Sequence, residues 1–163
     1  MPIDPDLFRR IMSQFATGVT IVTTRAGEEI HGLTANSFCS VSLEPPLVLV
    51  CVDQQAQSHD LIAAGRNFAV NILAASQEAL ARRFATNHLP AAERFAGIQF
   101  HPEATGAPIL QDALGWLDCT LFARYPGGDH TIFVGEVVAL GRRDGDEPLL
   151  YFASNYQNLT APG

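Results

Sequence analysis

The sequence predicts a mainly β protein: a β-barrel of antiparallel strands with helices inserted in its middle. Several segments alternate between apolar and polar residues or are rich in β-branched residues, and short turns containing glycine or aspartate join them. The size of the chain agrees with this class, because 163 residues of which 47% are hydrophobic can bury one substantial core. We therefore expect a single domain over residues 1–163.

The first third predicts a helix followed by three strands. Asp4 and Pro5 form an N-cap and a first-turn proline, and apolar residues then recur at helical spacing. Residues 18–24 alternate with period two, and the RAGEE turn leads into a second extended segment, so this part predicts a β-hairpin. The run PLVLVCV predicts a buried strand that follows Pro45-Pro46, because proline cannot donate to a β-ladder.

The middle predicts two helices separated by a strand. Ser58 is well placed to cap a first helix that ends at Gly65, and Ser76 to cap a second over QEALARRFA. Residues 67–73 (NFAVNIL) predict the strand between them. Residues 86–111 contain three prolines and predict a long irregular segment around a short strand at 98–100.

The last third predicts three strands with short turns. In WLDCTLFARYP the apolar residues fall on one side, and Asp118 falls with the polar residues on the other. The turn PGGD leads into HTIFVGEVVALGRR, and the turn DGDE leads into PLLYF.

Charge and composition exclude some classes of function. A net charge of −7 and a pI near 5.0 argue against nucleic acid as a partner, because phosphate-backbone binding depends on clustered basic residues. No run of apolar residues is long enough to span a bilayer, so we expect no membrane insertion. The N-terminal residues read neither as a signal peptide nor as a transit peptide, and we expect a cytoplasmic protein. Cys39, Cys51 and Cys119 lack CxxC spacing, which predicts reduced thiols buried as small hydrophobic residues.

Familiar catalytic and cofactor motifs are missing from the sequence. It contains neither a GxxxxGK[ST] loop nor a GxGxxG loop between a strand and a helix, and no GxSxG elbow. The five histidines are spread over different segments without HxH or HExxH spacing, so we expect no metal site.

The segment GLTANS (residues 32–37) is unusually poor in side-chain volume. Small residues there let the main chain approach a flat ligand, and the polar groups of Thr34, Asn36 and Ser37 offer hydrogen bonds without bulk. The alternative is the ordinary polar face of a hairpin strand. Ser58 at a helix start and Arg83 form a candidate phosphate site, although a plain N-cap and an exposed surface arginine are the more common explanations of such residues.

Five motifs, in order along nearly the whole chain, resemble the short-chain NAD(P)H:flavin oxidoreductases, the reductase components of two-component flavin-dependent monooxygenases. They are FATGVTIVTT, GLTANSFCSVSLEPPLVLVCV, NFAVNILAASQEALARRFA, GGDHTIFVGEVV and PLLYFASNY. The resemblance implies an antiparallel Greek-key FMN-binding split barrel that forms a homodimer. It also implies FMN or FAD, and NADH or NADPH, as the molecules that bind.

The resemblance also implies roles for particular residues. Flavin-binding positions are Thr34, Ala35, Asn36 and Ser37 along the ring edge, Cys51, Val52 and Asp53 along the ring or ribityl chain, and Ser58, His59, Arg83 and Phe84 near the phosphate. His130 in GGDH is the implied catalytic residue and dinucleotide contact, and Tyr156 is implied to cover one of the rings. Ala153-Ser154-Asn155 departs from the glycine and basic residue of many relatives, which leaves the choice between NADH and NADPH open.

The implied activity is hydride transfer from NAD(P)H to flavin N5, with reduced flavin passing to a partner monooxygenase. The sequence is compatible with two alternatives. In one, the flavin stays bound and the chain reduces another acceptor. In the other, the chain is a flavin-binding module without catalytic activity.

Overall fold

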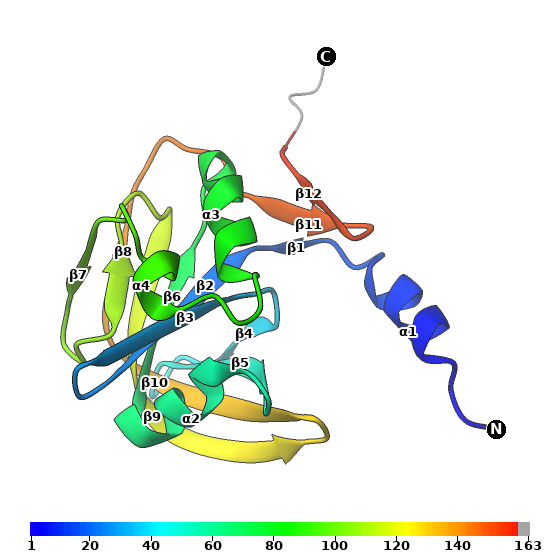
Figure 1. The fold of residues 1–163 in the computed structure, drawn as a ribbon, viewed down its shortest axis with the longest axis horizontal. Helices are drawn as coiled ribbons and strands as arrows, with labels where there is room; N and C mark the ends of the chain where they lie inside the picture. The colour runs from blue at the N-terminus through cyan, green and yellow to red at the C-terminus, as the bar shows by residue number, and fades with distance from the viewer. Residues whose placement is uncertain (160–163) are drawn as a thin grey trace.

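The computed structural model describes residues 1–159, which form a seven-stranded antiparallel sheet, two smaller sheets and four helices (Figure 1). The strands are β1 (Thr17–Gly18), β2 (Thr20–Ala26), β3 (Glu29–Ala35), β4 (Phe38–Ser42), β5 (Leu47–Asp53), β6 (Asn67–Ile72), β7 (Phe100–Pro102), β8 (Pro108–Leu110), β9 (Gly115–Gly127), β10 (His130–Arg142), β11 (Leu150–Phe152) and β12 (Asn155–Gln157). The helices are α1 (Pro5–Met12), α2 (Gln57–Gly65), α3 (Glu78–Phe84) and α4 (Ala91–Arg94), and a 3-10 turn, η1 (Ala75–Gln77), precedes α3.

The large sheet has the strand order β3-β2-β6-β9-β10-β5-β4, so β3 and β4 are its two edges. These edges are consecutive in sequence, and only Asn36 and Ser37 join them. Ser37 ties the corner to β5, because its carbonyl accepts from the Cys51 N–H at 3.1 Å and its hydroxyl donates to the Cys51 carbonyl at 2.8 Å. The mainly β, antiparallel class is confirmed. The hydrogen-bonded ladder itself does not close, because β3 and β4 do not pair with each other.

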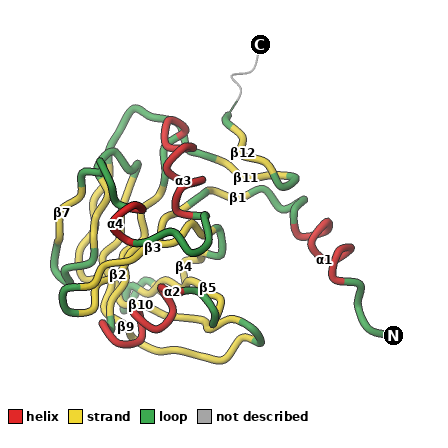
Figure 2. The backbone as a smooth tube through the Cα atoms, viewed as in Figure 1, coloured by secondary structure: helices red, strands yellow, loops and turns green. Residues whose placement is uncertain are grey.

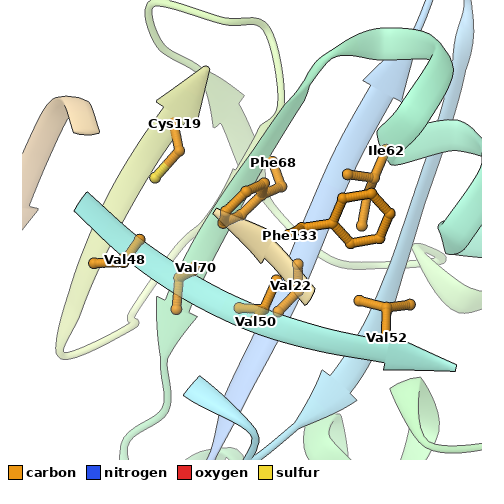
Figure 3. Close-up of a cluster of buried hydrophobic side chains, with 9 residues drawn as sticks. All are labelled: Val22, Val48, Val50, Val52, Ile62, Phe68, Val70, Cys119 and Phe133. Carbon is orange, nitrogen blue, oxygen red and sulfur yellow. The ribbon is translucent and has the colours of Figure 1, made fainter. Parts of the chain in front are cut away.

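The main core lies between the strands of this curved sheet and α2. Figure 3 shows its nine buried side chains: Val22, Val48, Val50, Val52, Ile62, Phe68, Val70, Cys119 and Phe133. Alternate residues of β5 point into it, which explains why PLVLVCV is so apolar. A side chain at Gly135 would come within 2.5 Å of the Phe68 ring, so glycine is required where β10 crosses that ring.

The helix-start predictions are correct for α1 and wrong for α2 and α3. Asp4 caps α1, and its side chain accepts from the Asp6 N–H at 2.9 Å. Ala56, not Ser58, precedes α2, because the Ser58 hydroxyl is buried against His31. Ser76 lies inside the 3-10 turn before α3.

The predicted end of α2 at Gly65 is confirmed, but for a different reason. The left-handed residue is Arg66, with φ of 53°. A Cβ at Gly65 would lie 2.1 Å from the Arg25 carbonyl oxygen, so this glycine permits close packing of α2 on β2.

The segment predicted as irregular contains more structure than expected. It holds α4 and the β7–β8 hairpin, and the strand predicted at 98–100 begins only at Phe100. Asp118, placed on the polar side of β9, is fully buried. Its carboxylate accepts from the Thr105 N–H at 2.8 Å and from the Thr105 hydroxyl at 2.5 Å, because the loop before β8 covers that side of the strand.

The N-terminal helix and the small sheet β1-β11-β12 extend away from the main sheet, as Figures 1 and 2 show. None of the residues of α1 is buried. Its apolar residues Leu7, Phe8, Ile11 and Met12 are exposed, as is Phe15 after it. An apolar helix that contacts so little of its own chain leaves a surface available for association.

The cysteine prediction is correct for Cys119 and wrong for Cys39. All three thiols are free, but only Cys119 is buried, Cys51 is half-buried, and Cys39 is exposed on edge strand β4. Burial, with a smaller contribution from the charge of Asp118, raises the pKa of Cys119 to about 12. In residues 1–159 no helix is long and apolar enough to cross a membrane.

Candidate functional site

Three hollows follow one another along β3. The inner hollow, about 210 Å³, is lined mainly by Thr34, Ala35, Asn36, Ala85, Tyr151 and Tyr156. The central hollow, about 330 Å³, is lined by residues 31–34, 55–58 and 84–88, with Asp53 and Arg94. The outer hollow, about 770 Å³, lies between the β2–β3 turn, α2 and residues 90–100. Thr34 and Ala85 belong to both the inner and the central hollow, and His31 and Gln57 to both the central and the outer.

The TANS residues lie at the end of β3, around the inner hollow and the corner beyond it. Because β3 is an edge strand, alternate residues turn their N–H and C=O groups away from β2 and toward the outside. The Thr34 hydroxyl donates to the Ala81 carbonyl at 2.6 Å, which anchors α3 to β3. Ala35 and Asn36 leave the inner hollow open, whereas Ser37 is engaged with Cys51.

Gly32 has a packing role that differs from the one predicted. A side chain there would come within 2.7 Å of the Phe84 ring and 3.2 Å of the Thr23 methyl group. The glycine therefore lets α3 pack on β3. Phe84 is buried, and it forms one wall of the central hollow.

A buried hydrogen-bonded triad separates the central from the outer hollow. His31 lies with its Nδ1 atom 2.5 Å from the Ser58 hydroxyl and its Nε2 atom 3.0 Å from Gln57 Oε1. Since the Gln57 oxygen can only accept, Nε2 carries the proton and Ser58 donates to Nδ1. Burial lowers the pKa of His31, and the charge of Arg94 lowers it further. The imidazole is therefore neutral at pH 7.

This lowered pKa predicts a loss of stability on acidification. In the unfolded chain this histidine binds a proton near the ordinary pKa of about 6.5, whereas the folded chain binds it only at lower pH. The free energy of unfolding therefore decreases as the pH falls below about 6.5. Urea unfolding at pH 7.5 and 5.5 measures the decrease. The decrease should be smaller in His31→Asn, which cannot titrate, and an equal decrease in both proteins would contradict the assignment.

Arg94 is buried beside the central hollow, and no carboxylate within residues 1–159 forms an ion pair with it. Its two terminal nitrogens donate to the carbonyls of Phe84, Thr86 and Leu89 at 2.8 to 3.1 Å, which shapes the loop after α3. Among residues 1–159, the Arg94 Nε and the Thr17 hydroxyl are the buried side-chain polar atoms without a hydrogen-bond partner. The guanidinium lines the central hollow, and its buried positive charge favours an anion there.

The end of β5 forms the rim of the central hollow, but its three predicted residues differ in orientation. The Val52 side chain is in the core, so only its main chain can face a ligand. Cys51 is half-buried and bonded through its main chain to Ser37. Asp53 lines the central hollow, and its carboxylate accepts from the Gln55 N–H at 2.8 Å.

The GGDH turn lies beside this rim. His130 is the register partner of Asp53 in the β5–β10 ladder, and the Gln54 N–H donates to the Asp129 carbonyl at 3.0 Å. The His130 Nδ1 atom is 2.7 Å from the Asp129 carboxylate, and this hydrogen bond lowers the pKa of Asp129. The His130 side chain is 41% exposed, so a ligand arriving from solvent can reach it.

Two predicted phosphate contacts lie outside the central hollow. His59 binds Thr131 through Nε2 at 2.8 Å and packs against the Phe133 ring, so it connects α2 to β10. Arg83 is exposed and donates to the Ala96 carbonyl. Ser58 does line the hollow, through its contact with His31.

Tyr156 lines the inner hollow opposite the TANS residues. Its ring packs edge-on against Tyr151, with centroids 5.4 Å apart, and the Arg82 guanidinium lies 4.8 Å from its centroid. Burial raises the pKa of Tyr156. The C-terminal sheet thus contributes an aromatic wall.

Sequence reasoning missed His31, Gln57, Ala85 and Arg94 as site residues. His31 occupies an ordinary strand position, and Ala85 carries no distinctive chemistry. Arg94 directly precedes Phe95 within ERFAG, and a basic residue in such a sparsely charged segment was the only available signal.

Comparisons with known proteins show which proteins this chain resembles. Residues 12–160 match the model of the flavin reductase like domain. The chain is 42% identical over 160 residues to the NADH-dependent FAD reductase of Streptomyces globisporus, covering 97% of this chain and 87% of that protein. It is 36% identical over 159 residues to HsaB, the reductase subunit of a flavin-dependent monooxygenase of Mycobacterium tuberculosis, covering 96% and 83%. The structure of the S. globisporus NADH:FAD oxidoreductase SgcE6 with NAD and FAD fragments superposes with a TM-score of 0.89 at 40% identity, covering 98% of this chain and 97% of that one.

Proposed function

Because the chain belongs to the flavin reductase-like family, we propose that it is an NAD(P)H:flavin oxidoreductase that reduces FMN or FAD and supplies reduced flavin to a partner monooxygenase. The observation that carries this proposal is the line of hollows along the outer edge of β3, with Arg94 at its centre and the GGDH turn at its rim. Bound flavin supplies the chemistry, since it accepts a hydride from NAD(P)H at N5.

The residues present fit a flavin. Its ring requires a flat slot with main-chain groups at one edge, and β3 offers its unpaired edge beside Ala35 and Asn36. Its phosphate requires a positive charge, and the Arg94 guanidinium lines the neighbouring hollow. We assign the ring to the inner hollow and the phosphate to the central hollow.

The chain's own task is to orient the two reactants rather than to supply a strong acid or base. Thr34 fixes α3 against β3, so the slot keeps its width. Tyr156 closes the inner hollow from the C-terminal sheet. His130 stands at the rim, where it can hold the nicotinamide dinucleotide against the exposed face of the slot.

Steady-state oxidation of NADH and NADPH, with and without added FMN, FAD or riboflavin, tests the activity. Flavin should stimulate oxidation severalfold or more. Failure of every flavin to stimulate would refute the proposal. A yellow colour that survives gel filtration, together with turnover of another acceptor, would favour a tightly bound flavin instead.

Arg94, rather than Arg83, should carry the preference for a phosphorylated flavin. A charge-assisted hydrogen bond contributes about 1.5 to 3 kcal/mol, or roughly 10- to 100-fold in affinity. Wild-type protein should therefore bind FMN more tightly than riboflavin by about this factor, and Arg94→Met should bind the two almost equally. Equilibrium titration of flavin fluorescence measures both dissociation constants.

Two further variants control this experiment. Arg94→Lys retains the charge and should keep part of the preference, and Arg83→Met should leave it unchanged. An unaltered riboflavin affinity in Arg94→Met reports that the loop after α3 has kept its shape. If the preference disappears in Arg83→Met and persists in Arg94→Met, the assignment of the phosphate to Arg94 is wrong.

We also propose that the chain is one domain that forms a homodimer through α1 and the exposed apolar residues of the large sheet. The unburied apolar side of α1 supports this proposal. Further exposed apolar side chains are Val41 on β4, Leu43 in the turn after β4, and Val138 and Leu140 on β10. Light scattering should give a mass of two chains for the wild type and a smaller mass for Phe8→Asp. A monomeric wild type would contradict the proposal.

A further inference from the structure

The outer hollow has no role in the function proposed so far, although it is the largest of the three. Its floor is apolar and comes from Ile30, Leu61, Ala91, Ala92, Phe95 and Phe100. Three carboxylates, those of Glu28, Glu29 and Asp60, lie at its rim. Such a lining fits a flat, uncharged aromatic ring that carries hydrogen-bond donors at its edge.

The outer hollow continues the line of the flavin site. A β-strand rises about 3.3 Å per residue, so β3 from Ala35 to Glu29 spans roughly 20 Å and passes all three hollows. The central and outer hollows share His31 and Gln57. They also share an aromatic wall, because the Phe95 ring packs edge-on against Phe84 at 5.1 Å and against Phe100 at 5.4 Å.

We propose that the outer hollow binds the adenine base of FAD and makes the chain prefer FAD to FMN, an inference that rests on the flavin reductase activity proposed above. The ring and the first phosphate of a flavin fill the inner and central hollows. A flavin dinucleotide continues from that phosphate, past the His31–Gln57 pair, to a second nucleoside. The adenine amino group donates to the rim carboxylates, and its ring lies on the apolar floor.

The charges in this region agree with that placement. Arg94 offers its positive charge at the central hollow, where the pyrophosphate would lie. The carboxylates stand one hollow further along, and the Asp60 side chain is 95% exposed, so solvent screens its repulsion of the phosphates.

The nicotinamide dinucleotide is a weaker candidate for the outer hollow. Its motif, the GGDH turn, contacts Gln54 in the loop before α2. The described lining of the outer hollow comes from the β2–β3 turn, α2 and residues 90–100, and includes none of residues 53–56. A dinucleotide held by His130 therefore approaches the flavin from the other end of the central hollow.

Filling the outer hollow tests the inference. Ala92 is exposed on α4 and lines the hollow, so Ala92→Trp places a ring in it without disturbing the core. Ala64→Trp is the matched control, because Ala64 is exposed on α2 outside the hollow. Dissociation constants for FAD, FMN and riboflavin, measured by fluorescence titration of the flavin-free protein, are the readout.

Wild-type protein and Ala64→Trp should bind FAD more tightly than FMN by about tenfold, the effect of burying one aromatic base. Ala92→Trp should weaken FAD to the level of FMN and leave FMN and riboflavin unchanged. Equal affinities for FAD and FMN in the wild type would overturn the inference, and so would an effect of Ala92→Trp on the KM for NADH alone. If the wild type binds none of the three flavins, the flavin reductase proposal itself is rejected.

Discussion

Ala85→Trp should lower the affinity for every flavin by at least about 100-fold, because a bulky side chain at this position fills the junction of the inner and central hollows. Ala85 is exposed at the end of α3 and lines both hollows, so the substitution adds volume without entering the core. Flavin-stimulated NADH oxidation should fall in parallel. Titration of flavin fluorescence and initial-rate measurements check the two quantities.

Ala79→Trp controls for the added tryptophan. Ala79 is exposed on the same helix and lines neither hollow. The control protein should bind flavin and turn over like the wild type. If Ala85→Trp also retains wild-type flavin affinity, the ring and phosphate do not occupy these hollows.

Phe133→Ala should lower the free energy of unfolding by about 3 to 5 kcal/mol. Phe133 is fully buried among the valines of β5 and the residues of α2 and β6, and it supports the His59 ring, so the truncation leaves a cavity in the main core. Urea unfolding followed by far-UV circular dichroism measures the change.

The comparison for this variant is Tyr125→Ala. Tyr125 is about half exposed on the β9–β10 arm, and its truncation should cost less than about 1 kcal/mol. A loss in Phe133→Ala no larger than that of Tyr125→Ala would contradict the central place of Phe133 in the core.

Elements with strong local patterns could be predicted from the sequence. The β2–β3 hairpin follows from period-two alternation around a glycine turn, and β5 follows from its continuous apolar run after Pro45-Pro46. The α1 helix begins where Asp4 supplies a cap to a free N–H group. In each case one stretch of chain contains the cause.

Side-chain roles that depend on distant partners could not be predicted in this way. The sequence predicts that Ser58 caps a helix, but its hydroxyl donates a hydrogen bond to His31, which lies 27 residues away in the sequence. Arg94 resembles any surface arginine until the loop after α3 folds around it and presents three carbonyls. Asp118 sits at a polar position of β9, but the loop containing Thr105 buries it. Periodicity describes which way a side chain points, not which segment will cover it.

The family motifs predicted a set of site residues, and the fold brings part of that set together around the hollows. The TANS segment and Tyr156 do enclose one hollow, and GGDH does lie at the rim of the next. Val52, His59 and Arg83 turn their side chains elsewhere, because the core, Thr131 and the Ala96 carbonyl engage them. A residue can therefore lie next to site residues in the sequence while its side chain points away from the site.

Hydrogen exchange with and without saturating FAD tests most directly whether flavin lies along the outer edge of β3. Binding should slow amide exchange in peptides covering residues 31–37, 53–58 and 84–95, which surround the central hollow and its neighbours. The β7–β8 hairpin beyond Phe100 should exchange at the same rate in both states. Slowed exchange confined to that hairpin, or unchanged exchange along β3, would show that flavin binds elsewhere.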